Sequence, residues 1–279
     1  MRIVIAFVVG VIVARGLVFA LADVLASPVL QRENYRGRRL PTAAGLVLVF
    51  TVLAVEGARA ALGALGVGDD TVPAARIRVL VAVVGFGLLG LLDDLLGNGD
   101  ARGFRGHVGA LVHARVTTGF CKLAGGAALA LVLASVAHDG SGFETFVDAA
   151  LIALAANLAN LLDRVPGRAI KAALVAYVPV LILCGTDATG VATAVVLGAA
   201  LALLPDDLRE RLMLGDTGAN VVGAVLGLAV VIEAGTGTRL VVAAVLFAVN
   251  VLSEFVSFST VIRRVPPLRR FDELGRGNL

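Results

Sequence analysis

The chain has 279 residues, of which 58% are hydrophobic, and it carries a formal net charge of +3. Its apolar residues gather into runs of about 20, the length that a helix needs to cross a bilayer, which is unlike a soluble domain. This pattern excludes a soluble globular protein and favours a multi-pass membrane protein with no nucleic-acid partner. The first run lacks a small-residue cleavage site, so we expect it to be retained as a span.

Nine apolar runs follow one another, and each predicts a helix. They cover about Ile3–Ala26, Ala43–Ala64, Ala74–Leu92, Thr118–Ala137, Phe146–Leu162, Ala169–Leu183, Ala188–Leu204, Gly218–Ile232 and Leu240–Ile262. We therefore expect an all-α bundle of about nine transmembrane helices that forms a single domain over residues 1–279. Cys121 and Cys184 fall at opposite ends of such a bundle, so no disulfide is expected.

The basic residues predict the orientation of the chain. Most Lys and Arg residues lie in the polar segments after the first, third, fifth, seventh and ninth runs. Because cytoplasmic loops of membrane proteins are enriched in Lys and Arg, these segments are expected on the cytoplasmic side of the cell membrane. The amino terminus is then outside and the carboxyl terminus is cytoplasmic.

The first of these segments carries Arg38 and Arg39, followed by Pro41 and Thr42. Pro41 and Thr42 mark an expected helix start, with Thr42 as a candidate cap. The arginines suit the binding of a phosphate group. Anchoring to lipid head groups explains them equally well.

Two adjacent carboxylates, Asp93 and Asp94, close the third run. Acids at the edge of a membrane span are costly unless they have a role, and carboxylates are suitable ligands for a divalent cation. The bases Arg102 and Arg105 follow and could hold phosphate, whereas His107 is expected to be structural or interfacial. A solvated helix end is the alternative for the acid pair.

Further polar residues stand at the cytoplasmic ends of later runs. Asn157, Asn160 and Asp163 recur every three residues and so share one helical face. For the two asparagines alone, hydrogen bonding between helices is the better explanation. Asp216 lies between glycines at the start of a helix, where it could face a metal or act as an ordinary cap.

Four more cations complete the expected site: Lys122, Arg168, Arg269 and Arg270. The last two belong to an arginine-rich tail that suits either anionic lipid or a diphosphate.

The order of these motifs resembles one family, the polyprenyl-phosphate N-acetylhexosamine-1-phosphate transferases. The shared features are Pro-Thr-x-x-Gly after the first run, Asp-Asp after the third, Asn-x-x-Asn-Leu-x-Asp after the fifth and Gly-Asp-x-Gly after the seventh. They extend from about Asn34 to Arg276.

The resemblance implies Mg²⁺-dependent transfer of a sugar phosphate from a UDP-sugar to a polyprenyl phosphate, with release of UMP, in cell-envelope glycan synthesis. It implies catalytic roles for Asp93, Asp94 and Asp163, and metal binding by Asp216 and Asp94. It implies substrate contacts from Thr42, Arg38, Arg39, Lys122, Asn157, Asn160, Arg168, Arg269 and Arg270.

Three departures mark a divergent member of that family. Pro166 stands where the family has a polar residue near the uracil, and arginines replace a His-rich stretch in the tail. The family also commonly has a tenth span. A related transferase with another phosphate-linked donor, and a non-catalytic polyprenyl-phosphate-binding or scaffolding protein, therefore remain alternatives. A homodimer is a possible assembly.

Overall fold

The structure is a computed structural model that describes residues 1–68, 71–97, 118–137 and 140–276. Its long helices are α1 (Arg2–Ala20), α3 (Leu46–Ala64), α4 (Ala74–Leu96), α6 (Thr118–Ser135), α7 (Gly142–Leu162), α8 (Arg168–Cys184), α9 (Ala188–Leu208), α10 (Gly215–Glu233) and α11 (Thr236–Ser253). The shorter elements are α2 (Ala22–Leu25), η1 (Pro28–Leu30), β1 (Gln31–Glu33), β2 (Arg39–Pro41), α12 (Phe258–Arg264) and α13 (Pro266–Glu273).

The expected all-helical, multi-pass bundle is confirmed at this level. Seven of the helices in the described residues are long and apolar enough to cross a membrane. The count of nine spans stays a prediction, because α8 has only 17 residues and the apolar part of α6 is equally short. Both cysteines are free, as expected.

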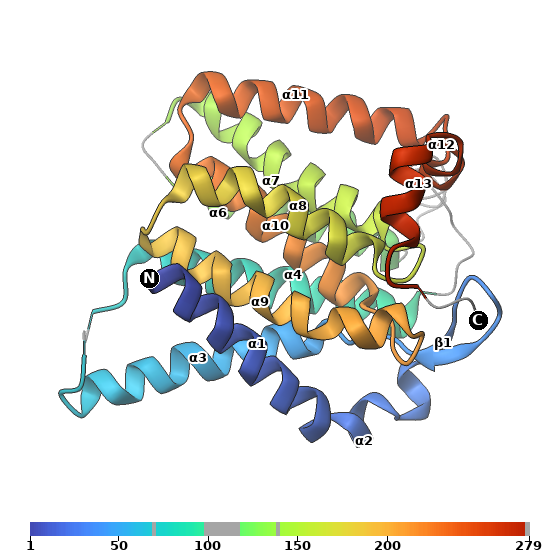
Figure 1. Ribbon diagram of the computed structural model, residues 1–279. Coiled ribbons are helices and arrows are strands. Elements are labelled where there is room, and N and C mark those ends of the chain that lie inside the picture. Colours follow the sequence, from blue (N-terminus) through green and yellow to red (C-terminus); the bar gives the residue numbers. More distant parts are fainter. Residues whose placement is uncertain (69–70, 98–117, 138–139, 277–279) are drawn as a thin grey trace.

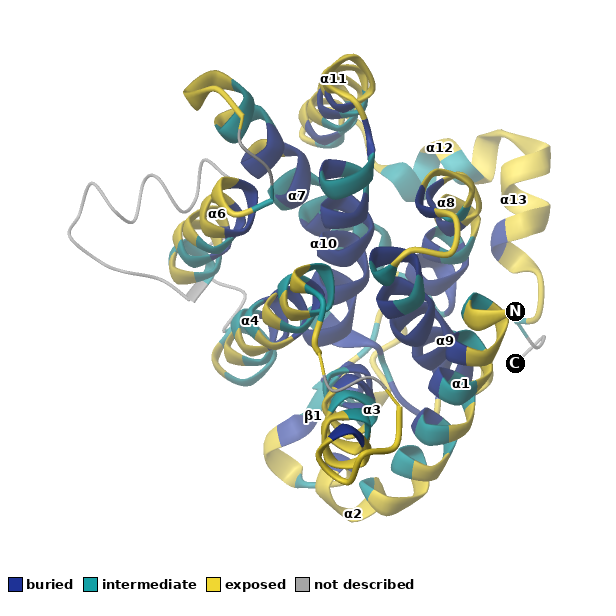
Figure 2. Ribbon diagram, turned by 90° about the vertical axis from the view of Figure 1, so that its left-hand side faces the viewer, coloured by how far each residue is buried: buried dark blue, intermediate teal, exposed yellow. Residues whose placement is uncertain are grey.

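Helix α10 forms the centre of the bundle, and Figure 2 shows the other long helices arranged around it. Of its most apolar stretch, 78% is buried. Glycine permits this close packing: a Cβ atom at Gly223 would lie 2.3 Å from the carbonyl oxygen of Ala155 in α7. Small residues let helices in a bilayer approach closely, which replaces the hydrophobic driving force that is absent there.

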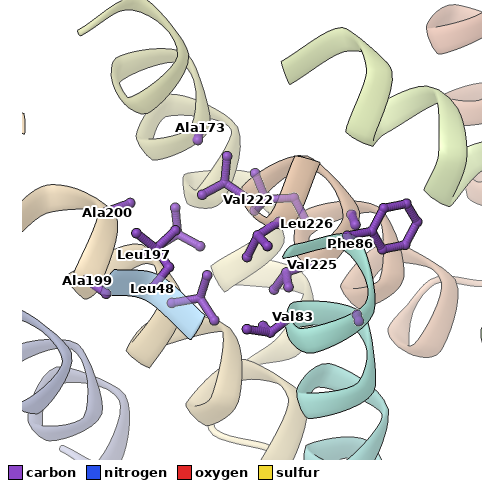
Figure 3. Close-up of a cluster of buried hydrophobic side chains, with 14 of the residues drawn as sticks. Leu48, Val83, Phe86, Ala173, Leu197, Ala199, Ala200, Val222, Val225 and Leu226 are labelled. Atoms are coloured by element: carbon purple, nitrogen blue, oxygen red, sulfur yellow. The ribbon is translucent and has the colours of Figure 1, made fainter. Parts of the chain in front are cut away.

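The apolar core lies where five helices meet. Figure 3 shows Leu48 from α3, Val83 and Phe86 from α4, Ala173 from α8, Leu197, Ala199 and Ala200 from α9, and Val222, Val225 and Leu226 from α10. The outward faces of the bundle are also apolar, with Ile182 80% exposed and Phe19 72% exposed. Apolar surface inside and outside is what a bundle surrounded by lipid requires.

The segment after α1 is folded differently from the expectation. Strands β1 and β2 form an antiparallel hairpin, and α3 begins at Leu46, so Thr42 does not cap it. The backbone between Pro41 and Gly45 instead pairs with the segment before α10: the N–H of Met213 donates to Pro41 at 2.8 Å, and that of Gly45 donates to Leu214 at 2.9 Å. These contacts take the hydrogen bonds that an earlier helix start would have used.

The ninth apolar run also differs, because it forms two helices rather than one. Helix α11 ends at Ser253, and α12 begins at Phe258. The Ser253 hydroxyl donates to the carbonyl oxygen of Asn250 at 2.6 Å, and such a bond competes with the helical ladder. The chain then turns into α13, which lies beside the start of α8 (Figure 1).

Candidate functional site

Asp94 binds the amino-terminal end of the central helix. One of its carboxylate oxygens accepts the backbone N–H of Asp216 at 3.0 Å and the Thr42 hydroxyl at 3.4 Å. The other accepts the backbone N–H of Thr217 at 2.9 Å and the Thr217 hydroxyl at 2.6 Å. The first N–H groups of a helix have no partner within it, and they attract negative charge. Asp94 therefore supplies from α4 the cap that α10 lacks.

Gly215, the first residue of α10, is required by this arrangement. Its φ is +71°, and a Cβ atom there would lie 2.7 Å from a carboxylate oxygen of Asp94. Any other residue would be strained and would also push the capping carboxylate away.

The neighbouring carboxylate, Asp93, faces a different group. The ammonium of Lys122 in α6 contacts Asp216 and lies 3.4 Å from an Asp93 oxygen. The amide of Asn160 in α7 donates to the same Asp216 oxygen at 3.0 Å. Asp93, Lys122, Asp216 and Asn160 thus form one polar cluster, which we call the Lys122 cluster. Between 17% and 25% of each charged side chain is exposed, so the cluster is partly buried but accessible.

Asp163 follows α7 at the same end of the bundle. Burial raises the pKa of Asp163 well above its ordinary value, and the nearby carboxylates of Asp207 and Asp216 raise it further. Such a group favours its neutral form, and perturbed carboxyls of this kind gather at functional sites.

Arg168, a residue that the resemblance implies in substrate contacts, binds the tail of the chain. Its guanidinium makes two hydrogen bonds to the Asp272 carboxylate in α13, at 2.8 and 2.9 Å, and a third to Ser259 at 2.8 Å. Lys171 donates to the carbonyl oxygen of Asp272 at 2.5 Å. Arg276 donates to Asp272 at 2.7 Å. Burial opposes ionisation of Asp272, but the hydrogen bonds from Arg168 and Arg276 outweigh it and hold the pKa of Asp272 below its ordinary value.

The other expected ligands are dispersed. Arg38 lies 3.2 Å from Glu210, while Arg39, Arg269 and Arg270 are exposed. Asn157 donates to Asn250 of α11 at 2.7 Å rather than to the Lys122 cluster. The shared helical face expected for Asn157 and Asn160 therefore serves two different helix contacts.

Sequence reasoning missed two acids at this end of the bundle. Asp207 accepts the backbone N–H of Gly167 at 2.8 Å and so fixes the turn before α8. Glu210 accepts from Asn34 at 3.0 Å and pairs with Arg38, which holds the β1–β2 hairpin in place. The sequence did carry a signal for Asp207. Asp206 and Asp207 form an adjacent acid pair at the end of α9, like Asp93 and Asp94 at the end of α4.

Residues 98–117, which include Arg102, Arg105 and His107, lie outside the described residues. Among those that the structure describes, no three His, Cys, Asp or Glu side chains gather closely enough to hold a metal by themselves. Mg²⁺, however, is usually held by one or two carboxylates together with substrate phosphates. Asp93 and Asp216, which both face the ammonium of Lys122, provide two carboxylates and so fit the protein ligands that Mg²⁺ requires.

Comparisons with protein-family models and with curated protein sequences find no match to this chain. The family resemblance therefore rests on the motifs alone.

Proposed function

We propose that this protein transfers a sugar 1-phosphate from a UDP-sugar to a polyprenyl phosphate, on the cytoplasmic face of the cell membrane. The observation that carries the proposal is the Lys122 cluster, in which residues of α4, α6, α7 and α10 converge. These helices are separate in the sequence, and their apolar surroundings make charged groups expensive. A chain that brings two carboxylates and an ammonium together at a membrane surface is suited to phosphate chemistry.

Asp216 and Asp93 are the residues that would hold Mg²⁺, in place of the Asp94 and Asp216 pair expected from the sequence. Asp94 uses both of its oxygens to cap α10, so its role is to position Asp216. When bound, Mg²⁺ would neutralise the diphosphate and stabilise the UMP leaving group.

Lys122 balances the two acids when no substrate is present. Its ammonium is a compact charge on a flexible stem, so it can turn from Asp216 to a phosphate oxygen. An oxygen of the lipid phosphate attacks the phosphorus that carries the sugar. A new P–O–P linkage forms, and the bond from that phosphorus to the UMP oxygen breaks, with the electron pair leaving on UMP. The acceptor is already largely ionised near neutral pH, so positioning matters more than base strength.

Pro166 stands where the resemblance implies a polar residue near the nucleotide. The carbonyl oxygen of Pro166 accepts a hydrogen bond from Arg276 at 2.9 Å, which ties the α7–α8 connection to the tail. A donor panel is therefore needed, and UDP-sugars are the first class to examine.

The test is release of UMP by purified protein supplied with Mg²⁺, a polyprenyl phosphate and a panel of UDP-sugars. The Asp216→Asn variant should lose activity by at least a hundredfold, whereas Asp23→Asn, which alters an exposed acid outside the cluster, should not. Unchanged turnover in Asp216→Asn would contradict the assignment.

A second candidate is a non-catalytic protein that binds polyprenyl phosphate. One observation favours it: Arg38 and Arg168, two residues that the resemblance implies in substrate contacts, already pair with Glu210 and Asp272, whereas Lys122 can still turn to a lipid phosphate. Folded protein that binds polyprenyl phosphate but releases no nucleotide from any donor would support this alternative.

A further inference from the structure

The ammonium of Lys122 lies between two carboxylates, where a divalent cation would also be held. It contacts Asp216 and lies 3.4 Å from Asp93, through one Oδ2 atom of each acid. The acids belong to α10 and α4 and the lysine belongs to α6, so the packing of three helices brings these groups together. Carboxylate oxygens are also the protein ligands that Mg²⁺ and Mn²⁺ prefer. The ammonium and a divalent cation would therefore use the same oxygens.

Lysine is a rare choice of cation in this chain. Lysine and arginine together number 24, and only Lys122 and Lys171 are lysines. An arginine would grip carboxylates with a rigid planar fork, whereas the lysine ammonium is a compact charge on a flexible stem. Lys171 donates to three backbone carbonyl oxygens of the tail, at 2.5, 3.0 and 3.1 Å. Lys122 instead contacts side chains and is 17% exposed, so it can turn away without opening the fold.

The charges allow one cation at this position but not two. With two acids and one ammonium, Asp93, Asp216 and Lys122 together carry a net negative charge. A divalent cation in place of the ammonium makes the group neutral, but beside the ammonium it leaves an excess of positive charge. Between 17% and 25% of each side chain is exposed, so water screens this repulsion only in part. The ammonium must therefore leave before a metal enters.

The position of Asp216 does not depend on the ammonium. Its backbone N–H donates to Asp94 at 3.0 Å, and its carboxylate accepts the amide of Asn160 at 3.0 Å. Neither contact involves Lys122, so the carboxylate keeps its place when the ammonium turns away. A phosphate group offers the ammonium a second anionic partner, and hydrogen bonds between ionised groups are strong. Phosphate is therefore the ligand that can release the carboxylates for a metal.

We infer that Lys122 keeps divalent cations out of the site until a phosphate group draws its ammonium away. Metal and phosphate then bind cooperatively, and each raises the affinity for the other by the same factor. The inference rests on the proposed function for the identity of the metal and of the phosphate, but its test measures binding alone. The alternative is a permanent salt bridge that ligands do not alter.

The experiment measures binding of Mn²⁺, which takes the same oxygen ligands as Mg²⁺ and whose free form gives an electron paramagnetic resonance signal. Lys122→Met removes the ammonium, and Lys122→Arg keeps a positive charge. Arg164→Met is the matched control, because Arg164 is an exposed cation that follows α7 at the same end of the bundle and lies outside the Lys122 cluster. All of the full-length proteins are titrated in one detergent.

Without phosphate, Lys122→Met should bind Mn²⁺ at least about tenfold more tightly than the unmodified protein, a coupling of ordinary size between two sites. Lys122→Arg should bind Mn²⁺ no more tightly than the unmodified protein, and Arg164→Met should differ from it by less than about twofold. Equal affinities of Lys122→Met and the unmodified protein would overturn the inference. A gain in Arg164→Met as large as that in Lys122→Met would also overturn it, because general attraction between charges would then be the cause.

A second measurement needs no substitution. Saturating decaprenyl phosphate should tighten Mn²⁺ binding by the unmodified protein at least about tenfold, after subtraction of a titration of the lipid and detergent alone. Unmodified protein that binds Mn²⁺ equally tightly with and without this lipid would overturn the inference.

The two proposals can fail separately. If UMP release fails with every donor while these binding results hold, the proposed transferase activity is wrong and the exclusion of metal by Lys122 stands. If UMP is released but Mn²⁺ binding does not depend on Lys122, only the inference about Lys122 is wrong.

Discussion

The Asp94 cap leads to a prediction that separates two adjacent acids. In Asp94→Asn, the amide keeps one oxygen acceptor but presents an NH₂ group to the other pair of donors at the start of α10. A buried backbone N–H that loses its acceptor costs about 1–3 kcal/mol, and the loss of a charged acceptor weakens the remaining bonds as well. We expect a loss of about 3 kcal/mol in the free energy of unfolding.

For a protein of this size, about 3 kcal/mol corresponds to a fall in Tm on the order of 5–10 °C. Asp93→Asn is the control, because Asp93 faces Lys122, which keeps its contact with Asp216. Loss of that partly exposed pair should cost about 1 kcal/mol or less. Both are measured by circular dichroism in the same detergent at one scan rate. Equal falls in Tm, or an Asp94→Asn protein as stable as the unmodified one, would refute the capping role.

Three further predictions concern packing and the tail. Gly45→Ala should prevent folding or separate α3 from α10, because its Cβ atom would lie 2.2 Å from the Cα of Gly218. Gly57→Ala, in open space on α3, is the control and should leave the free energy of unfolding unchanged or raise it by up to about 1 kcal/mol. On gel filtration, the Gly57→Ala protein should be monodisperse and the Gly45→Ala protein should not. Arg168→Gln should destabilise the docked tail by about 3 kcal/mol, because the buried Asp272 carboxylate loses its main partner. Adding Asp272→Asn should recover part of that stability, and limited proteolysis of the tail measures both. A double variant no more resistant than Arg168→Gln would contradict that pairing. Because the pKa of Asp272 is lowered in the folded protein, its ionised form stabilises docking of the tail above its ordinary pKa of about 3.9, and this stabilisation is lost as the pH falls through the lowered pKa. Protection of the amides of residues 266–273, taken as the exchange rate relative to that of an unfolded chain at the same pH, should therefore be equal at pH 6 and at pH 5. It should fall only below about pH 4, and a fall at pH 5 would exclude this cause.

The helical, multi-pass class of the fold could be predicted because it depends on the length and polarity of apolar runs. The rotation of each helix could not be predicted in this way. Asp93 and Asp94 are adjacent in the sequence, but one faces Lys122 and the other caps α10. Asn157 and Asn160 share a spacing of three residues and still contact different helices. Such differences depend on neighbours that are distant in the sequence.

The polar contacts of the tail were equally inaccessible. Nothing local in the sequence indicates that Arg168 pairs with Asp272, because its choice of partner depends on where α13 lies. The break between α11 and α12 is similar: the apolar run continues past Ser253, but the structure shows that α11 ends there, where the Ser253 hydroxyl donates to the carbonyl oxygen of Asn250.

The pairing of Arg168 with Asp272 also has a consequence for biosynthesis. The two residues are separated by 104 positions, so Arg168 leaves the ribosome first. At ~5–20 residues per second, its partner follows about 5–20 s later. During that interval α8 carries two cations, Arg168 and Lys171, that lack the carboxylate and carbonyl oxygens of the tail. The start of α8 therefore reaches its final arrangement only when synthesis of the chain is nearly complete.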